Sequence, residues 1–221
     1  MVHFIALVLI ALASAGPASA GAREGALRNL VAEGERWWKS SPDPQDPVAC
    51  ATCHYDPGET RGWAASFPKY RPLPPPDGRV MTLFQANAEA VQRHYRLHDT
   101  ELPALAITAY LTARGAGTSI SPGIVAGQPV FEGRLRALAE SVKRGERLYA
   151  RRCRSCHEAS AFAPAALLFP TVGNGQVEPL ERFLGRHRPE LPRLGSGSQP
   201  ATDVMAFVMS RLAGRPVAIA P

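Results

Sequence analysis

The strongest constraint on this chain is a short motif that occurs twice and uses every cysteine. The 221-residue sequence has four cysteines, found in Cys50-Ala-Thr-Cys53-His54 and Cys153-Arg-Ser-Cys156-His157. Cys-x-x-Cys-His is typical of covalent haem attachment, because two thiols about one helical turn apart can each bond one vinyl group of the same porphyrin. The histidine that follows can then bind the iron. The sequence therefore predicts two haem c groups, attached through Cys50, Cys53, Cys153 and Cys156, with His54 and His157 as axial ligands.

Three other uses of paired cysteines fit less well. A four-cysteine zinc site usually has its pairs roughly 15–20 residues apart, whereas Cys53 and Cys153 are 100 positions apart. Thioredoxin-like redox disulfides require a βαβ context, and no such pattern is present. Structural disulfides would leave the two adjacent histidines as a coincidence.

The two motifs belong to a diverged internal repeat. Gly34-Glu-Arg-Trp-Trp38 precedes the first motif and matches Gly145-Glu-Arg-Leu-Tyr149 before the second. Arg93-His94 matches Arg186-His187, and apolar segments at 101–115 and 202–214 close the two halves. Helical spacing is clear in 101–115, with Thr100 as N-cap and Gly115 as stop, and the segments that start at Ala32 and Leu138 also have helical character.

Each half thus has a helix, a Cys-x-x-Cys-His motif, a long loop, a histidine and a closing helix. This order resembles that of class I cytochrome c domains, and the resemblance implies that the first and last helices cross while loops wrap the haem. We expect an all-α protein of two such domains in tandem. The expected segments are a signal peptide (1–20), domain 1 (21–115), a Gly/Ser/Pro-rich linker (116–127) and domain 2 (128–221).

The second axial ligands must come from the few remaining histidines and methionines. His187 is the best candidate in the second half, and its repeat partner His94 is favoured in the first. His98 and Met81 remain open as alternatives to His94. Met205 and Met209 lie four residues apart at helical spacing beside apolar positions, so we expect them to pack in the core.

The N-terminus and the charge distribution indicate export and an acidic partner. An apolar run at 4–13 and the Ala18-Ser-Ala20 site predict a secretory signal peptide cleaved after Ala20, and no later stretch is apolar for long enough to cross a membrane. We expect a periplasmic or otherwise exported protein, not transmembrane once processed.

Residues 126–221 have 14 Lys/Arg against 8 Asp/Glu, whereas residues 21–125 have 11 of each. In an exported protein this excess favours an acidic redox partner over nucleic acid. Arginines near the second haem could steer such a partner: Arg147, Arg151, Arg152, Arg154, Arg186 and Arg188.

Residues 45–160 also resemble SoxA, the dihaem cytochrome subunit of the sulfur-oxidising complex of bacteria. The matching stretches are Cys50-Ala-Thr-Cys-His54, Phe67-Pro-Lys-Tyr70, Gly78-Arg-Val-Met-Thr-Leu83 and Leu105-Ala-Ile-Thr-Ala-Tyr-Leu111. In that family the haem irons have distal cysteine ligands, one of which takes part in joining thiosulfate to a partner protein. Here every cysteine belongs to an attachment motif, so a distal thiol ligand is excluded.

These patterns predict an electron carrier rather than an enzyme. It would pass single electrons between redox partners through two haems, each bound by two histidines. Two alternatives stay open. One is a haem subunit of a sulfur-compound (thiosulfate) oxidising enzyme, and the other is a haem-based gas or redox sensor. Both require a coordination position open to substrate or gas.

Overall fold

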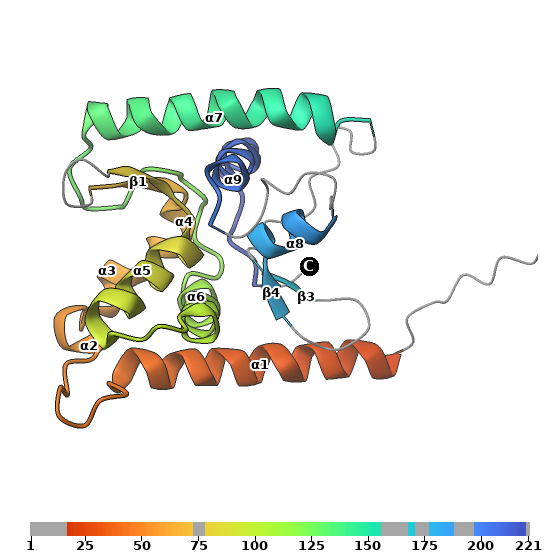
Figure 1. The fold of residues 1–221 in the computed structure, drawn as a ribbon. Coiled ribbons are helices and arrows are strands. Elements are labelled where there is room, and N and C mark those ends of the chain that lie inside the picture. The colour runs from red at the N-terminus through yellow and green to blue at the C-terminus, as the bar shows by residue number, and fades with distance from the viewer. Residues whose placement is uncertain (1–16, 73–77, 156–167, 171–176, 188–196, 220–221) are drawn as a thin grey trace, which may run out of the picture.

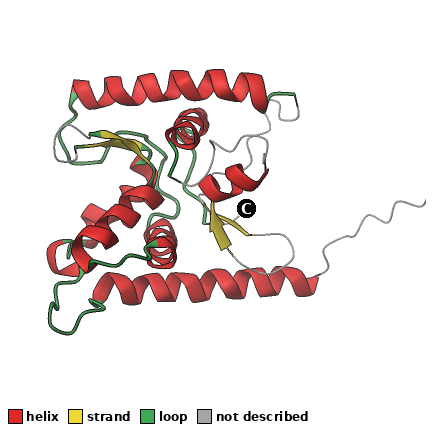
Figure 2. Cartoon of the chain, in the orientation of Figure 1, coloured by secondary structure: helices red, strands yellow, loops and turns green. Residues whose placement is uncertain are grey.

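The computed structural model describes residues 17–72, 78–155, 168–170, 177–187 and 197–219. Helices dominate this part of the chain (Figure 2), which confirms the mostly helical fold class. In chain order the elements are α1 (Pro17–Lys39), α2 (Cys50–Cys53), α3 (Pro57–Arg61), α4 (Trp63–Ser66), β1 (Lys69–Arg71), β2 (Arg79–Met81), α5 (Leu83–Tyr95), α6 (Glu101–Arg114), α7 (Glu132–Arg152), β3 (Leu168–Pro170), β4 (Val177–Pro179), α8 (Leu180–His187) and α9 (Gln199–Arg211).

The same helix crossing occurs once in each half. Helix α1 packs against α6, and α7 packs against α9. In Figure 1 the long helices α1 and α7 lie in the plane of the view, while α6 and α9 are seen end-on between them. Gly34 and Gly145 stand at the two crossings, where a Cβ atom would lie 1.9 Å from the carbonyl oxygen of Ala106 and 1.8 Å from that of Asp203. The glycine of each Gly-Glu-Arg repeat therefore lets two backbones touch.

The aromatic residue four positions after each glycine repeats as well. Trp38 packs against Tyr110 of α6 with ring centroids 6.1 Å apart, and Tyr149 packs against Phe207 of α9 at 5.2 Å. Such tilted aromatic pairs add to the apolar area buried at each crossing.

Local signals account for several helix ends. Thr82 and Gln85 form a reciprocal capping box at the start of α5, and Ser198 accepts a hydrogen bond from the backbone N–H of Ala201 in α9. Helix α6 has Thr100 and Gly115 at its ends, as the sequence predicts. Helices α1 and α7 begin earlier than the predicted starts at Ala32 and Leu138. Met205 and Met209 are buried in α9, as predicted.

Two short antiparallel hairpins were not predicted. Strand β1 pairs with β2 with Lys69 opposite Met81, and β3 pairs with β4 with Leu168 opposite Pro179. Each strand has only three residues. Three residues are too few to give a visible two-residue alternation, so tertiary packing rather than sequence pattern determines these strands.

The two halves share buried contacts across residues 116–127. Met209 and Leu212 belong to the same apolar cluster as Trp38 and Ile107. Ile120 is buried, its N–H donates to the carbonyl of Arg215 at 2.8 Å, and its carbonyl accepts from the N–H of Gly214 at 2.9 Å. The predicted linker is thus hydrogen-bonded to the C-terminal end of the chain.

A buried carboxyl group lies between the halves. Glu181, in the first turn of α8, is 2% exposed and lines a small cavity of about 20 Å³ with Thr82, Thr108 and Met209. Its Oε1 atom has no hydrogen-bond partner within the described residues. Burial raises the pKa of Glu181, while a hydrogen bond with Thr82 lowers it by a smaller amount.

We expect Glu181→Gln to make the protein less sensitive to pH. The folded state binds a proton at Glu181 that the unfolded chain releases above its pKa of about 4.5, so stability is lost as pH rises from that value through the folded pKa. The amide has no charge to gain, so the free energy of unfolding of the variant should fall less with rising pH than that of the unmodified protein. Urea unfolding at several pH values measures the slope, with Glu132→Gln, on the exposed start of α7, as control. If the free energy of unfolding changes with pH equally in Glu181→Gln and in the unmodified protein, Glu181 does not have a raised pKa in the folded state.

Candidate haem site

The first attachment motif lines a cavity of about 290 Å³ enclosed by α2, α5 and neighbouring elements. Its walls are mainly apolar and aromatic, with contributions from Trp38, Trp63, Phe67, Leu83, Ala86, Ala90, Val91, Tyr95 and Ile107. Polar groups enter at a few positions: Cys50, Cys53, His54, Glu59, Lys69, Arg71, Asn87, His94 and Gln128. A mostly apolar cavity with a few convergent polar side chains is the usual form of a cofactor site.

A single helical turn presents both thiols to this cavity. Thr52 caps the turn by accepting a hydrogen bond from the Ala49 N–H at 3.1 Å, and the His54 N–H donates to the Cys50 carbonyl at 2.9 Å. Both cysteines are free thiols. The turn therefore places two thiols and the following imidazole together, as the spacing of the motif requires.

Tyr95 fixes the first thiol against helix α1. Its hydroxyl donates to the carbonyl of Trp37 at 2.6 Å, accepts from the Cys50 N–H at 3.2 Å and lies 3.3 Å from the Cys50 sulfur. Burial raises the pKa of the Cys50 thiol, so the sulfur is protonated at neutral pH. This contact orders the start of the motif from the far end of α5.

Aromatic rings contact the imidazole of His54. The His54 ring stacks on Trp38 with centroids 6.0 Å apart and meets the edge of Trp63 at 4.8 Å. Burial lowers the pKa of His54, Glu59 raises it, and the nearby charges of Arg71 and His94 lower it. A neutral imidazole is the form that binds a metal.

His94 lies on α5 and lines the same cavity as His54. The alternatives lie elsewhere: Met81 is buried in β2, His98 is exposed between α5 and α6, and neither lines the cavity. The first half thus brings Cys50, Cys53, His54 and His94 together. Which side chain is the second iron ligand remains a prediction.

The second motif is only partly within the described residues. Cys153 caps the end of α7, with its N–H donating to the Tyr149 carbonyl at 2.9 Å. Cys156 and His157 lie outside the described residues, and His187 is the last residue of α8. The four proposed contributors to a second haem site therefore stay predictions.

Most of the side chains that line the first cavity were missed by the sequence analysis, among them Lys69, Arg71 and Tyr95. Lys69 and Arg71 come from β1, and Tyr95 ends α5 one residue after His94. No periodic pattern marks the two cations, because the strand has only three residues, although Lys69 lies in the Phe67–Tyr70 stretch that resembles SoxA. Tyr95 could have been noticed from its position beside the repeated Arg-His pair.

The cavity suits a covalently attached haem better than a bare metal ion. Among the described residues no group of three or more His, Cys, Asp or Glu side chains could hold a metal ion. Two free thiols one turn apart and two imidazoles instead border a largely apolar space. The two thiols would hold a porphyrin covalently, and the imidazoles would be available as ligands to its iron.

No known protein family model matches the chain, and no curated protein sequence is significantly similar to it. Among solved structures, its fold is similar to that in the crystal structure of SoxXA from P. pantotrophus, with a TM-score of 0.65 and 17% sequence identity. The match covers 91% of this chain and 81% of that chain. The chain thus has a SoxA-like cytochrome fold, as the sequence resemblance implies.

Proposed function

We propose that this protein is an exported c-type cytochrome that transfers single electrons through two covalently bound haems. The observation that carries the proposal is the first cavity, where two free thiols and two imidazoles border an apolar space inside a SoxA-like fold. The repeated helix crossing supports a second site of the same kind beside α7 and α9. The proposed haem domains are 21–115 and 128–221.

In the first site, Cys50 and Cys53 would bond the porphyrin, and His54 and His94 would bind its iron. Haem supplies a one-electron redox centre whose potential depends on its ligands and burial. The protein's part is to hold the imidazoles and to exclude water. Trp38 and Trp63 orient His54, while Leu83, Val91 and Ile107 supply apolar wall.

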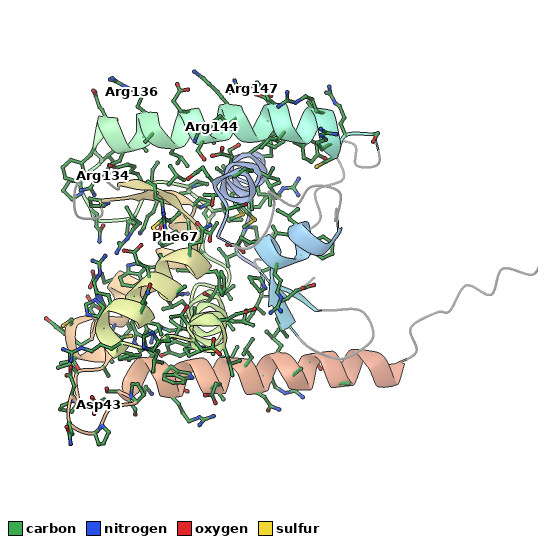
Figure 3. All side chains as sticks on the ribbon, in the orientation of Figure 1. Asp43, Phe67, Arg134, Arg136, Arg144 and Arg147 are labelled. Atoms are coloured by element: carbon green, nitrogen blue, oxygen red, sulfur yellow. The ribbon has the colours of Figure 1, made fainter. Side chains whose placement is uncertain are left out.

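The exposed face of α7 is the proposed docking surface for an acidic redox partner. Arg136 and Arg147 point away from the body of the protein (Figure 3), and Arg151, Arg152 and Arg154 are exposed around Cys153. Arg144 is engaged by Asp203, so it contributes less. An attraction of this kind speeds encounter and weakens as salt screens the charges.

Export is proposed from the sequence. Residues 1–16 lie outside the described residues, and the predicted cleavage site after Ala20 falls in the first turns of α1. None of the described helices has the length and apolar character needed to cross a membrane.

A second candidate function is a haem subunit of a sulfur-compound oxidising enzyme. The fold similarity to SoxXA favours it. Optical and low-temperature EPR spectra of the mature protein, oxidised and reduced, separate the two functions. The electron carrier should show two low-spin haems that do not bind carbon monoxide. A high-spin haem, or a carbon monoxide shift in the unmodified protein, would contradict simple electron transfer and favour the enzyme or the sensor.

We expect His94→Ala to convert one of the two haems from low-spin to high-spin and to open it to carbon monoxide. The variant removes the imidazole that would fill the sixth position, and alanine cannot replace it. The matched control is His98→Ala, because His98 lies four residues away, is exposed and does not line the cavity. EPR and carbon monoxide difference spectra measure both. If His98→Ala produces the high-spin haem and His94→Ala does not, the ligand assignment is wrong.

A further inference from the structure

Two cationic side chains line the first cavity from a different element than the one that carries the thiols. Lys69 and Arg71 line the cavity from β1, whereas Cys50 and Cys53 line it from α2. Figure 1 shows α2 and β1 at opposite ends of this half, separated by α5. Glu59, from α3, is the single carboxylate that lines the cavity within the described residues. The cavity therefore has a thiol end and a cationic end.

A small polar cleft of about 80 Å³ adjoins the cationic end. Lys69, Arg71 and Gln128 line both spaces, and Arg134 joins them from the first turn of α7, at the end nearest β1 (Figure 3). No Asp or Glu side chain of the described residues lines this cleft. The cationic side chains of three residues thus border a cleft that no carboxylate of the described residues lines.

These cations have no ion-pair partner within the described part of the chain. The Lys69 ammonium donates to the Ser66 hydroxyl at 3.1 Å and lies 4.5 Å from the Phe67 ring centroid. Arg134 lies over the Phe131 ring at 4.3 Å. Burial, together with the nearby positive charges of Arg71 and Arg134, lowers the pKa of Lys69 to about 8. Lys69 is half-buried beside the exposed Arg71 and Arg134, and an anion bound among these like charges would reduce their mutual repulsion.

We propose that Lys69, Arg71 and Arg134 form a carboxylate-binding site that takes the propionate groups of the haem in the first cavity. This inference rests on the function proposed above. Haem has two propionates on the ring edge opposite its two vinyl groups, so thiols at one end of a cavity and cations at the other match the two edges. Arginine binds carboxylates in two-point geometry, and the lysine adds a compact charge.

The test is the midpoint potential of the two haems in Lys69→Met and Arg71→Gln, each made in the full-length mature protein. Removing a cation beside the haem stabilises oxidised iron, so one of the two potentials should fall while the other stays. Lys69→Arg keeps the positive charge, so it should leave both midpoint potentials at the values of the unmodified protein. Arg79→Gln is the matched control, because Arg79 lies opposite Arg71 in the β1–β2 register, is exposed and lines neither space.

A free oxyanion such as sulfate could bind to the same cations as a haem propionate. A sulfate titration at constant ionic strength distinguishes these two ligands. A filled propionate site predicts that sulfate changes neither potential of the unmodified protein. If sulfate shifts a potential saturably, and Lys69→Met abolishes that shift, the site binds free anions and the propionate assignment is wrong. If haem is bound but all variants keep both potentials, the inference fails and the proposed function stands. If the purified protein contains no covalent haem, the function fails, and this inference fails with it.

Discussion

Replacing Gly34 or Gly145 by alanine is expected to be the most damaging small change in the molecule. Each added methyl group would meet a backbone carbonyl at less than 2 Å, at Ala106 for Gly34 and at Asp203 for Gly145. Overpacking a core usually costs about 1–3 kcal/mol when side chains can shift. Here two helix backbones must separate, so we expect a loss above ~3 kcal/mol, or failure to fold.

The chain offers matched controls for both positions. Gly133 lies on α7 and Gly25 on α1; a Cβ would meet nothing within 4 Å at Gly133, and only an Arg28 nitrogen at 4.0 Å at Gly25. Alanine should stabilise the helix there by about 0.5–1 kcal/mol. Thermal unfolding of the four variants measures the contrast. A small loss for Gly34→Ala or Gly145→Ala, comparable to the controls, would contradict the close crossing of α1 with α6 or of α7 with α9.

The second large effect is expected at Asp203, the buried polar centre of the α7–α9 contact. Its carboxylate is 3% exposed and accepts hydrogen bonds from Ser141 at 2.6 Å, from Arg144 at 2.7 and 2.9 Å and from Gln199 at 3.0 Å. Asp203→Ala leaves the fully buried Ser141 hydroxyl unpaired and removes the partner of Arg144. We expect a loss of about 3 kcal/mol in the free energy of unfolding.

Two variants bracket this expectation. Asp203→Asn keeps an oxygen that can accept from Ser141, so its loss should be smaller than that of alanine. Glu140→Ala breaks the exposed Lys143–Glu140 pair on α7 and should change stability by no more than about 0.5 kcal/mol. Chemical denaturation measures all three. If Asp203→Ala matches Glu140→Ala, the buried network does not stabilise the crossing.

Sequence patterns predicted the parts of this fold that depend on local spacing. The helical period of 101–115 and its end residues match α6, and the repeated glycine and aromatic positions mark both crossings. The spacing of Cys50, Cys53 and His54 predicted that one helical turn would bring two thiols and an imidazole together. These features are short-range, so neighbouring residues suffice to identify them.

Features that depend on tertiary packing could not be predicted. Glu181 looks like an ordinary first-turn acid of an amphipathic helix, yet α8 packs against α9 and Glu181 is buried in a cavity that Leu83, at the start of α5, also lines. Lys69 and Arg71 follow no periodic pattern, and the β1–β2 hairpin brings them to the first cavity. Such long-range contacts are set by the whole fold rather than by sequence neighbours.

The most direct test of the central claim is the mass of the intact mature protein after production in a host that attaches c-type haem. The account predicts the mass of the chain plus two haems, and the loss of one haem when Cys50 and Cys53 are both replaced by alanine. A chain without added haem, whether with free thiols or with the mass loss of disulfide formation, would contradict it.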